Sequence, residues 1–272
     1  MSQKSVCFIG AGNMTRSIVS GLINSGYAPQ LISVTNPSQP KLQSMATEFG
    51  VHTFQNNLDG ATLADIIVLS VKPQLMQAVC EQLSGLDLSK KLILTIAAGV
   101  TTQRYRDYLK QPIKLIRTMP NTPTQIGMGL TGLFASEDVS YEHKRLAEQL
   151  MKTGGEIVWV EQEHELNDVI ALAGSSPAYF FLFMEAMVES ATKKGMDEHK
   201  ARQMAQQAAL GAAQMVKHNS EISLAQLRLN VTSKGGTTAQ AIETFEKGNL
   251  RDLVDNAMTN CIARAEEMTE QF

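Results

Sequence analysis

The chain has 272 residues, of which 43% are apolar and 19% are charged, and its formal net charge is −3. This is the composition of an ordinary globular protein, and the length allows one large domain or two of ordinary size. Because the net charge supplies no basic field for a phosphate backbone, nucleic acid is not expected as a partner.

The sequence gives no sign of export, membrane insertion or metal binding. The apolar runs at 66–71 and 92–98 are far shorter than the roughly 20 residues of a membrane helix, and the first ten residues lack a signal-peptide layout. The three cysteines, Cys7, Cys80 and Cys261, have no C-x-x-C spacing and are expected to be buried small hydrophobic residues. We therefore expect a cytoplasmic protein with no membrane partner, disulfide framework or metal.

The first part of the chain alternates short apolar segments with segments of helical period. The expected strands lie at residues 6–9, 31–35, 66–71, 92–97, 114–117 and 157–160. Such alternation is typical of βαβ units around a parallel sheet that is buried on both faces. We therefore predict an α/β domain over residues 1–165.

The remaining residues, 166–272, are expected to form an all-α domain. Ser176 and Pro177 are suited to the start of a helix, and Gly195 can end it. Further helix starts are expected at Asp197, Ser223, Thr237 and Asn249.

The helix after Pro177 carries many large apolar side chains, namely Tyr179, Phe180, Phe181, Phe183, Met184 and Met187. They cover more than one face of the helix, and a small helical domain has few fully enclosed positions. We expect one side to pack on another subunit in a homo-oligomer; the alternative is burial inside a single-chain core.

A glycine turn follows the first expected strand directly and consists of Gly10, Ala11, Gly12, Asn13 and Met14. Gly10 permits a tight turn, and Gly12 lets the backbone approach a pyrophosphate at the positive end of the next helix. Thr15 stands at the third small position of this fingerprint. The βαβ context favours a Rossmann-type dinucleotide site over a plain structural turn.

The segment after the second expected strand concerns the ribose of that dinucleotide. It contains Asn36, Ser38 and Lys41, and residues 11–47 contain no acidic side chain. A carboxylate here would bond the 2′-hydroxyl of NAD and repel a 2′-phosphate. Its absence favours NADPH, with NADH possible but weaker; because the usual arginine is missing, a plain polar turn is the alternative.

Three more motifs follow expected strands, at the sheet edge where ligands bind in open parallel sheets. They are Val71-Lys72-Pro73, Ala97-Ala98-Gly99 and Met119-Pro120-Asn121-Thr122-Pro123. Lys72 by itself would also suit a solvated loop.

No nucleophile elbow, P-loop or histidine-based site is present, and Glu163-His164-Glu165 is interpreted as a solvated turn. Hydride transfer to a polarised acceptor needs little beyond a cofactor, orientation and a hydrogen bond.

A second glycine loop precedes an expected helix and contains Ser233, Gly235, Gly236, Thr237 and Thr238. Its backbone N–H groups can converge on a small carboxylate. From spacing alone, a plain Gly-Gly turn is the alternative.

Six segments resemble those of pyrroline-5-carboxylate reductases, in the same order and over nearly the whole chain. They are residues 8–14, 71–73, 97–101, 117–123, 174–179 and 230–242. The resemblance implies an N-terminal Rossmann domain and a C-terminal helical domain that interlocks two subunits, with a decamer as a possible higher assembly. It also implies NAD(P)H-dependent reduction of 1-pyrroline-5-carboxylate to L-proline, the last step of proline biosynthesis.

The resemblance also implies site residues. The cofactor contacts would be Gly10, Ala11, Gly12, Asn13, Met14, Asn36, Asn57, Val71, Lys72, Pro73, Ala97, Ala98 and Gly99. The substrate contacts, shared between subunits, would include Glu221, Asn230, Thr237 and Thr238, and the glycine loop adds Ser233, Gly235 and Gly236. We assign the Thr238 hydroxyl to the imine nitrogen as the catalytic group. The family usually has proline at the position of Lys234, and often arginine or serine at that of Pro37.

Two alternative functions are considered. A β-hydroxyacid dehydrogenase relative would need a catalytic lysine near residue 170, and residues 168–176 offer none. A regulator that binds NADP without turnover is distinguished by NADPH oxidation with the substrate.

Overall fold

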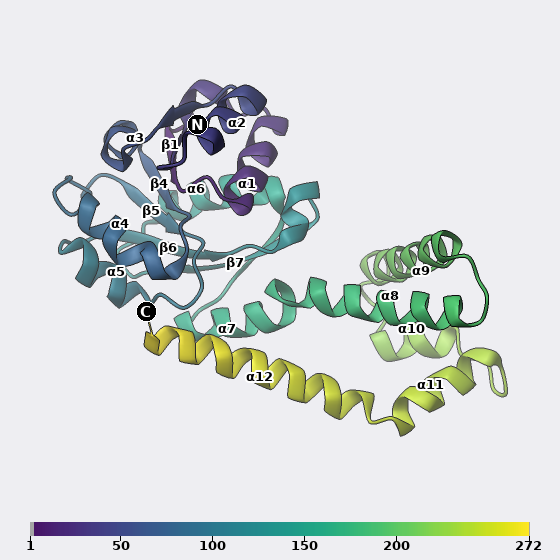
Figure 1. Cartoon of the computed structure of the whole chain (residues 1–272). Coiled ribbons are helices and arrows are strands. Elements are labelled where there is room, and N and C mark those ends of the chain that lie inside the picture. Colours follow the sequence, from purple (N-terminus) through teal and green to yellow (C-terminus); the bar gives the residue numbers. More distant parts are fainter. Residues whose placement is uncertain (1–2, 272) are drawn as a thin grey trace. The chain divides into compact units, whose positions relative to one another are not determined.

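The computed structural model describes residues 3–271, which form two compact units (Figure 1). The first unit comprises the chain up to Ser175 and from Cys261 onward, and the second comprises Ser176–Asn260. The chain thus passes between the units twice, whereas the sequence suggests a single boundary at residue 165.

The first unit is built on an eight-stranded sheet of order β3-β2-β1-β4-β5-β6-β7-β8. All neighbours run parallel except β6 and β7, which are antiparallel. The strands are β1 (Val6–Ile9), β2 (Ile32–Thr35), β3 (His52–Phe54), β4 (Ile66–Leu69), β5 (Leu92–Thr95), β6 (Lys114–Met119), β7 (Gly129–Ala135) and β8 (Gly155–Trp159). The order reverses between β1 and β4, and a doubly wound sheet binds its ligand at such a switch point.

Helices cover both faces of this sheet. They are α1 (Asn13–Asn24), α2 (Gln39–Phe49), α3 (Asn57–Leu63), α4 (Met76–Leu83), α5 (Thr102–Leu109), α6 (Tyr141–Met151) and α7 (Leu166–Val169). Short helical turns link them, namely η1 (Pro29–Leu31), η2 (Pro73–Leu75), η3 (Thr122–Ile126), η4 (Lys152–Gly154), η5 (Glu163–Glu165) and the π-helix η6 (Ile170–Gly174).

Alternate residues of β1 point into two separate cores. Val6 and Phe8 pack with residues of α1, α2 and α6, whereas Cys7 and Ile9 pack with residues of α3, α4 and α5. Burial on both faces explains why the strands read as continuous apolar runs. Cys80 lies in the second core, and burial raises the pKa of Cys7 to about 11 and that of Cys80 to about 12, so both thiols stay protonated. The predicted α/β class is confirmed.

The second unit is helical, as predicted. It contains α8 (Ser176–Lys193), α9 (Glu198–His218), α10 (Leu224–Asn230), α11 (Thr237–Lys247) and the beginning of α12 (Leu250–Gln271). Asp197 and Ser223 cap α9 and α10 by accepting hydrogen bonds from the Lys200 and Gln226 N–H groups. The expected cap at Thr237 is wrong by one residue, because Gly236 takes the extended N-cap conformation.

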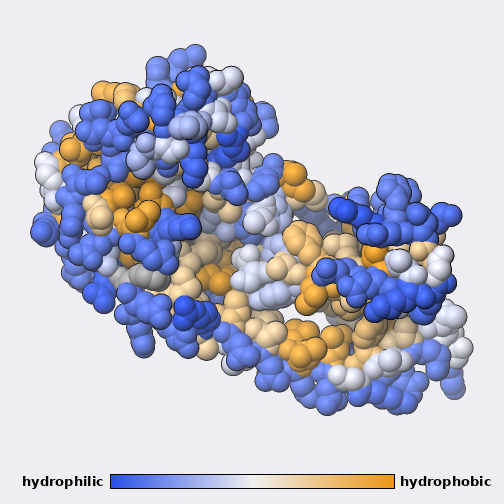
Figure 2. Space-filling view, viewed as in Figure 1, coloured by the Kyte–Doolittle hydropathy of each residue, from blue (hydrophilic) through white to orange (hydrophobic). Residues whose placement is uncertain are grey.

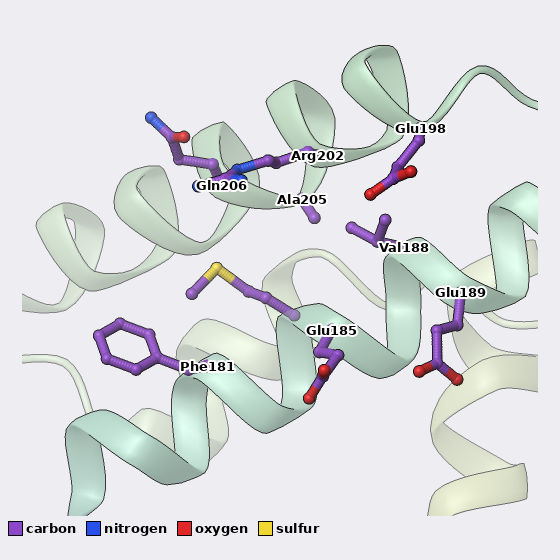
Figure 3. A pocket seen from close by; sticks show the side chains of 9 residues that line it. Phe181, Glu185, Val188, Glu189, Glu198, Arg202, Ala205 and Gln206 are labelled. Atoms are coloured by element: carbon purple, nitrogen blue, oxygen red, sulfur yellow. The ribbon is translucent and has the colours of Figure 1, made fainter.

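The second unit leaves large apolar side chains open to solvent. Phe180, Phe181 and Leu182 of α8 are 66%, 61% and 65% exposed. Figure 2 shows apolar residues gathered on the face of the helical part that it presents. A groove between α8 and α9 (Figure 3) is lined by Phe181, Met184, Glu185, Val188, Glu189, Glu198, Arg202, Ala205 and Gln206. Open apolar surface of this extent marks an interaction site.

Length and composition alone would let the helical stretch Glu163–Lys193 cross a membrane. It is a single candidate within residues 3–271, and α9, which packs against α8, carries Glu198, Lys200 and Arg202. One such helix is weak evidence for a membrane partner.

Candidate functional site

The glycine turn after β1 has the geometry that a pyrophosphate site requires. Gly10 has a φ of 113°, and a Cβ there would lie 2.7 Å from the Ser70 carbonyl oxygen. Gly12 is the N-cap of α1, and the place where its Cβ would stand is open space among the described residues. Thr15 fits the third small position because its buried hydroxyl donates to the Gly10 carbonyl at 2.7 Å.

Three helices at the predicted binding segments begin without a side-chain cap. They are α1 at Gly12, α2 at Ser38 and α11 at Gly236. Of the other helices, α4 and α7 also lack a side-chain cap, whereas α3, α5, α6, α9 and α10 are capped by the side chains of Asn56, Thr101, Ser140, Asp197 and Ser223. Since first-turn N–H groups have no acceptor inside the helix, an uncapped start leaves them available to an anionic ligand.

The loop after β2 is open and carries no acid. Asn36 lies at the end of the strand, where its side-chain oxygen accepts from the Ser38 N–H at 2.9 Å. Lys41 is exposed in the first turn of α2. The Ser38 hydroxyl does not cap α2, so it can donate to a ligand. These groups suit a phosphate better than a ribose hydroxyl.

Asn57, the first residue of α3, is held on both sides of its amide. Its Oδ1 accepts from the Thr35 hydroxyl at 2.7 Å, and its Nδ2 donates to Gln82 Oε1 at 2.9 Å. The Asn57 side chain therefore links the end of β2 to α4 by hydrogen bonds, in addition to its predicted role as a cofactor contact.

The remaining cofactor motifs lie at the same edge as Gly10. Val71, Lys72 and Pro73 follow β4, and Ala97, Ala98 and Gly99 follow β5, and β1, β4 and β5 are neighbouring parallel strands. Gly99 has a φ of 75°, and its Cβ would come within 2.8 Å of Met268 Cβ on α12. Lys72 is exposed. The structure therefore brings these segments together with the glycine turn.

The interpretation of residues 163–165 as a solvated turn is wrong for Glu163. Its Oε1 accepts from Arg117 Nη1 at 2.9 Å and from the Thr102 N–H and hydroxyl at 2.6 and 2.7 Å. Burial alone would raise the pKa of Glu163, but the hydrogen bonds from Thr102 and the charge of Arg117 hold it below its ordinary value. Arg117, which interrupts the apolar run of β6, is the sequence signal that an acidic partner exists elsewhere.

Asn121 is a second residue whose structural role cannot be predicted from the sequence alone. Pro177 has no N–H, so it cannot give the Ala173 carbonyl, four residues earlier, the usual α-helical hydrogen bond. Asn121 Nδ2 donates to that carbonyl at 3.0 Å, and its Oδ1 accepts from the Leu130 N–H at 2.9 Å. Asn121 thus joins the end of β6 and the start of β7 to the π-helix η6.

The predicted substrate residues lie in the second unit. Gly235 has a φ of 73°, which favours glycine, and a Cβ on Gly236 would stand 2.5 Å from the Ser233 hydroxyl oxygen and 3.1 Å from the Ser233 carbonyl oxygen, so the Ser233 side chain would have to move. Thr237 and Thr238 are the first, exposed residues of α11. Exposed Glu221 lies before α10, and exposed Asn230 ends it, accepting from Gln226 Nε2 at 2.8 Å.

No metal site accompanies these features in the part of the chain that the structure describes, because no three His, Cys, Asp or Glu side chains are grouped to hold an ion. The groups available are backbone N–H donors, small hydroxyls and amides. They can bind anions and orient a reactant for hydride transfer.

Comparisons with known proteins agree over both parts of the chain. Residues 163–268 match the family model described as pyrroline-5-carboxylate reductase dimerisation, and residues 5–99 match that described as NADP oxidoreductase coenzyme F420-dependent. A pyrroline-5-carboxylate reductase of Vibrio alginolyticus is 51% identical over 100% of both chains.

Solved structures give the same result. A pyrroline-5-carboxylate reductase from Coxiella burnetii is 45% identical and superposes with a TM-score of 0.92, covering 98% of this chain and 99% of that one. A Plasmodium falciparum pyrroline carboxylate reductase with NADP bound is 25% identical and superposes with a TM-score of 0.89 over 99% of both chains.

Proposed function

Because the chain belongs to the pyrroline-5-carboxylate reductase family, we propose that it reduces 1-pyrroline-5-carboxylate to L-proline with NADPH, the last step of proline biosynthesis. The observation that carries this proposal is the 51% identity to a named reductase over the full length of both chains. The uncapped glycine helix starts in both units support it independently.

The cofactor half of the proposal rests on the edge formed by β1, β2, β4 and β5. The N-terminus of α1 would hold the pyrophosphate, and Asn36, Ser38 and Lys41 would hold the 2′-phosphate. Asn57 and the segments Val71–Pro73 and Ala97–Gly99 complete the proposed contacts. The bound cofactor supplies the hydride, and the protein supplies its orientation.

The substrate half of the proposal rests on the start of α11. The N–H groups that follow Gly235 and Gly236 would bind the carboxylate, where the helix dipole favours a negative charge. Ser233, Thr237, Asn230 and Glu221 would complete this binding surface.

Thr238 would act on the reacting imine. A hydroxyl can donate to a neutral imine nitrogen and accept from an iminium, so one side chain can hold the ring in either protonation state as hydride reaches the carbon. The proton that becomes the N–H of proline is thereby kept within hydrogen-bond reach of the Thr238 hydroxyl.

The dimerisation domain makes the protein a homo-oligomer, and we extend the proposal to an interlocked dimer whose subunits share the substrate site. The exposed faces of α8 and α9 supply the apolar surface. Assembly of such dimers into a decamer in the cytoplasm is part of the same proposal. Light scattering of the purified protein measures the subunit number directly.

Steady-state oxidation of NADPH and of NADH in the presence of 1-pyrroline-5-carboxylate tests the proposal. We expect turnover with both and a higher kcat/KM with NADPH, by a modest margin because the 36–41 loop contains no arginine. If the protein bound NADPH tightly but gave no turnover, the reductase assignment would be wrong, and the alternative of a nucleotide-binding regulator would be favoured. A higher kcat/KM with NADH would overturn only the interpretation of the 36–41 loop.

A further inference from the structure

A charged side chain is buried in the middle of the sheet. Arg117 lies on β6, between β5 and β7, and is only 5% exposed. Burying a guanidinium is costly unless a counter-charge and hydrogen bonds accompany it. Arg117 Nη1 donates to Glu163 Oε1 at 2.9 Å, whereas its buried Nε has no partner. The whole charge compensation seen at this site therefore comes from Glu163.

The same carboxylate oxygen holds a third part of the chain. Thr102, the first residue of α5, donates both its N–H and its hydroxyl to Glu163 Oε1, at 2.6 and 2.7 Å. Three short bonds thus meet at one oxygen atom. Hydrogen bonds to an ionised acceptor are about twice as strong as neutral ones, so this junction is firmly held.

Thr102 ends the loop that begins with the cofactor motif Ala97–Gly99. The loop is anchored at its start, where the Ile96 N–H donates to the Leu69 carbonyl at 3.2 Å. At its far end, Thr101 caps α5 and Thr102 is bonded to Glu163. Position and direction of the loop backbone are therefore set at one end by the sheet and at the other by this carboxylate.

We propose that Glu163 is a positioning residue for the cofactor, which fixes the loop 97–101 in the conformation that contacts the nicotinamide half of NADPH. The proposal rests on the proposed function. The 2′-phosphate is assigned to the loop after β2, so the other half of the dinucleotide lies across the switch point, toward β4 and β5. Glu163 does not itself touch the cofactor, and it acts through Thr102.

The variant Glu163→Gln tests this inference. Glutamine keeps the shape of the side chain but loses the charge that pairs with Arg117 and strengthens the bonds from Thr102. We expect the Kd and KM for NADPH to rise about tenfold, the effect of losing one charge-assisted bond, while KM for 1-pyrroline-5-carboxylate changes less than about twofold. Glu161→Gln is the matched control, since it removes the same charge from an exposed residue two positions earlier.

A second variant covers the case in which Glu163→Gln fails to fold because Arg117 is left without a counter-charge. Thr102→Val removes only the hydroxyl bond and keeps the Arg117–Glu163 pair. It should raise the Kd for NADPH in the same direction but less, by roughly three- to tenfold, because the lost bond acts on the cofactor only through the loop and the Thr102 N–H bond to Glu163 remains.

Calorimetric titration with NADPH alone, together with the melting temperature, decides the matter. Weaker NADPH binding by folded Thr102→Val supports the positioning role. A lower melting temperature with unchanged NADPH affinity in both variants would overturn it and leave a purely structural ion pair. Because this titration needs no substrate, it stays informative if the wild-type protein fails to reduce 1-pyrroline-5-carboxylate, a result that would overturn the proposed function instead.

Discussion

The two units of the chain bury their apolar residues to very different degrees. In the first, the residues of β1, β4 and β5 are all buried, and helices close both faces of the sheet. In the second, α8 has no buried residue along its described length, and α9 has only Ala201 and Ala205. A sheet that is covered by its own helices is complete in one chain, whereas a helical unit with open apolar faces needs a second chain to enclose them. We therefore expect the unit with the proposed nucleotide site to be complete in one chain, and the unit with the proposed substrate residues to depend on assembly.

The largest expected effect comes from placing charge on the open helical surface. Phe180→Asp combined with Phe181→Asp should convert the oligomer to monomers and abolish reduction, because carboxylates cannot be buried in an apolar interface. NADPH binding should stay within about threefold of wild type, since the edge of the sheet is untouched. Light scattering and calorimetric titration measure the two properties. An intact oligomer with full activity would contradict the assigned interface.

The next largest effect concerns Thr238 at the start of α11. Thr238→Val keeps the shape of the side chain but removes the hydroxyl, so kcat/KM for 1-pyrroline-5-carboxylate should fall roughly 10- to 150-fold, as one bond to a charged group is worth about 1.5–3 kcal/mol. NADPH affinity should not change. Thr244→Val on the same helix is the matched control, because the Thr244 hydroxyl donates only to the Gln240 carbonyl. If both variants were equally active and stable, the assignment of Thr238 would fail.

A smaller effect is expected at the glycine turn of the first unit. Gly10→Ala combines a positive φ with a Cβ that would lie 2.7 Å from the Ser70 carbonyl, so we expect about 2–4 kcal/mol of lost stability and at least about tenfold weaker NADPH binding. Gly26→Ala separates the two causes, because Gly26 has a φ of 86° but open space around it. It should cost only about 1–2 kcal/mol and leave NADPH affinity unchanged. Equal losses in the two variants would show that the close approach to Ser70 is unimportant.

The smallest effect is a pH dependence. The pKa of Glu163 is lowered by folding, so the stability that its ionised form contributes is present above its ordinary pKa of 4.5 and is lost as the pH falls through the lower folded value. The difference in free energy of unfolding between wild type and Glu163→Gln should therefore shrink below about pH 4.5. Urea unfolding at neutral and acidic pH measures it. A difference that grows on acidification would have the wrong sign for this ion pair.

Much of the fold can be predicted from local sequence patterns. The elements that cannot be predicted depend on contacts between residues far apart in the chain. The strands at β1, β4 and β5 are predicted because burial on both faces makes them continuous apolar runs. The sequence does not predict β3, which has three residues at the sheet edge, none of them buried, or β7, which begins with glycine and joins the sheet antiparallel. Local propensity says little about such pairing partners.

In the candidate site, too, the features set by local sequence are predicted and those set by distant contacts are not. The glycine turns at Gly10 and Gly235 can be predicted from the sequence, because the positive φ that favours glycine there is a property of the local backbone. The pairing of Arg117 with Glu163 spans 46 residues, and that of Asn121 with Ala173 spans 52. No spacing rule connects such positions, and only the buried arginine in β6 hints that a partner must exist.

The measurement that tests the central claim most directly is the fate of the hydride. NADPH carrying deuterium at both C4 positions of the nicotinamide is incubated with the full-length protein and 1-pyrroline-5-carboxylate, and the product is examined by NMR. We expect L-proline with one deuterium at C5 for each NADPH consumed. Proline without deuterium, or consumption of NADPH without proline, would contradict it.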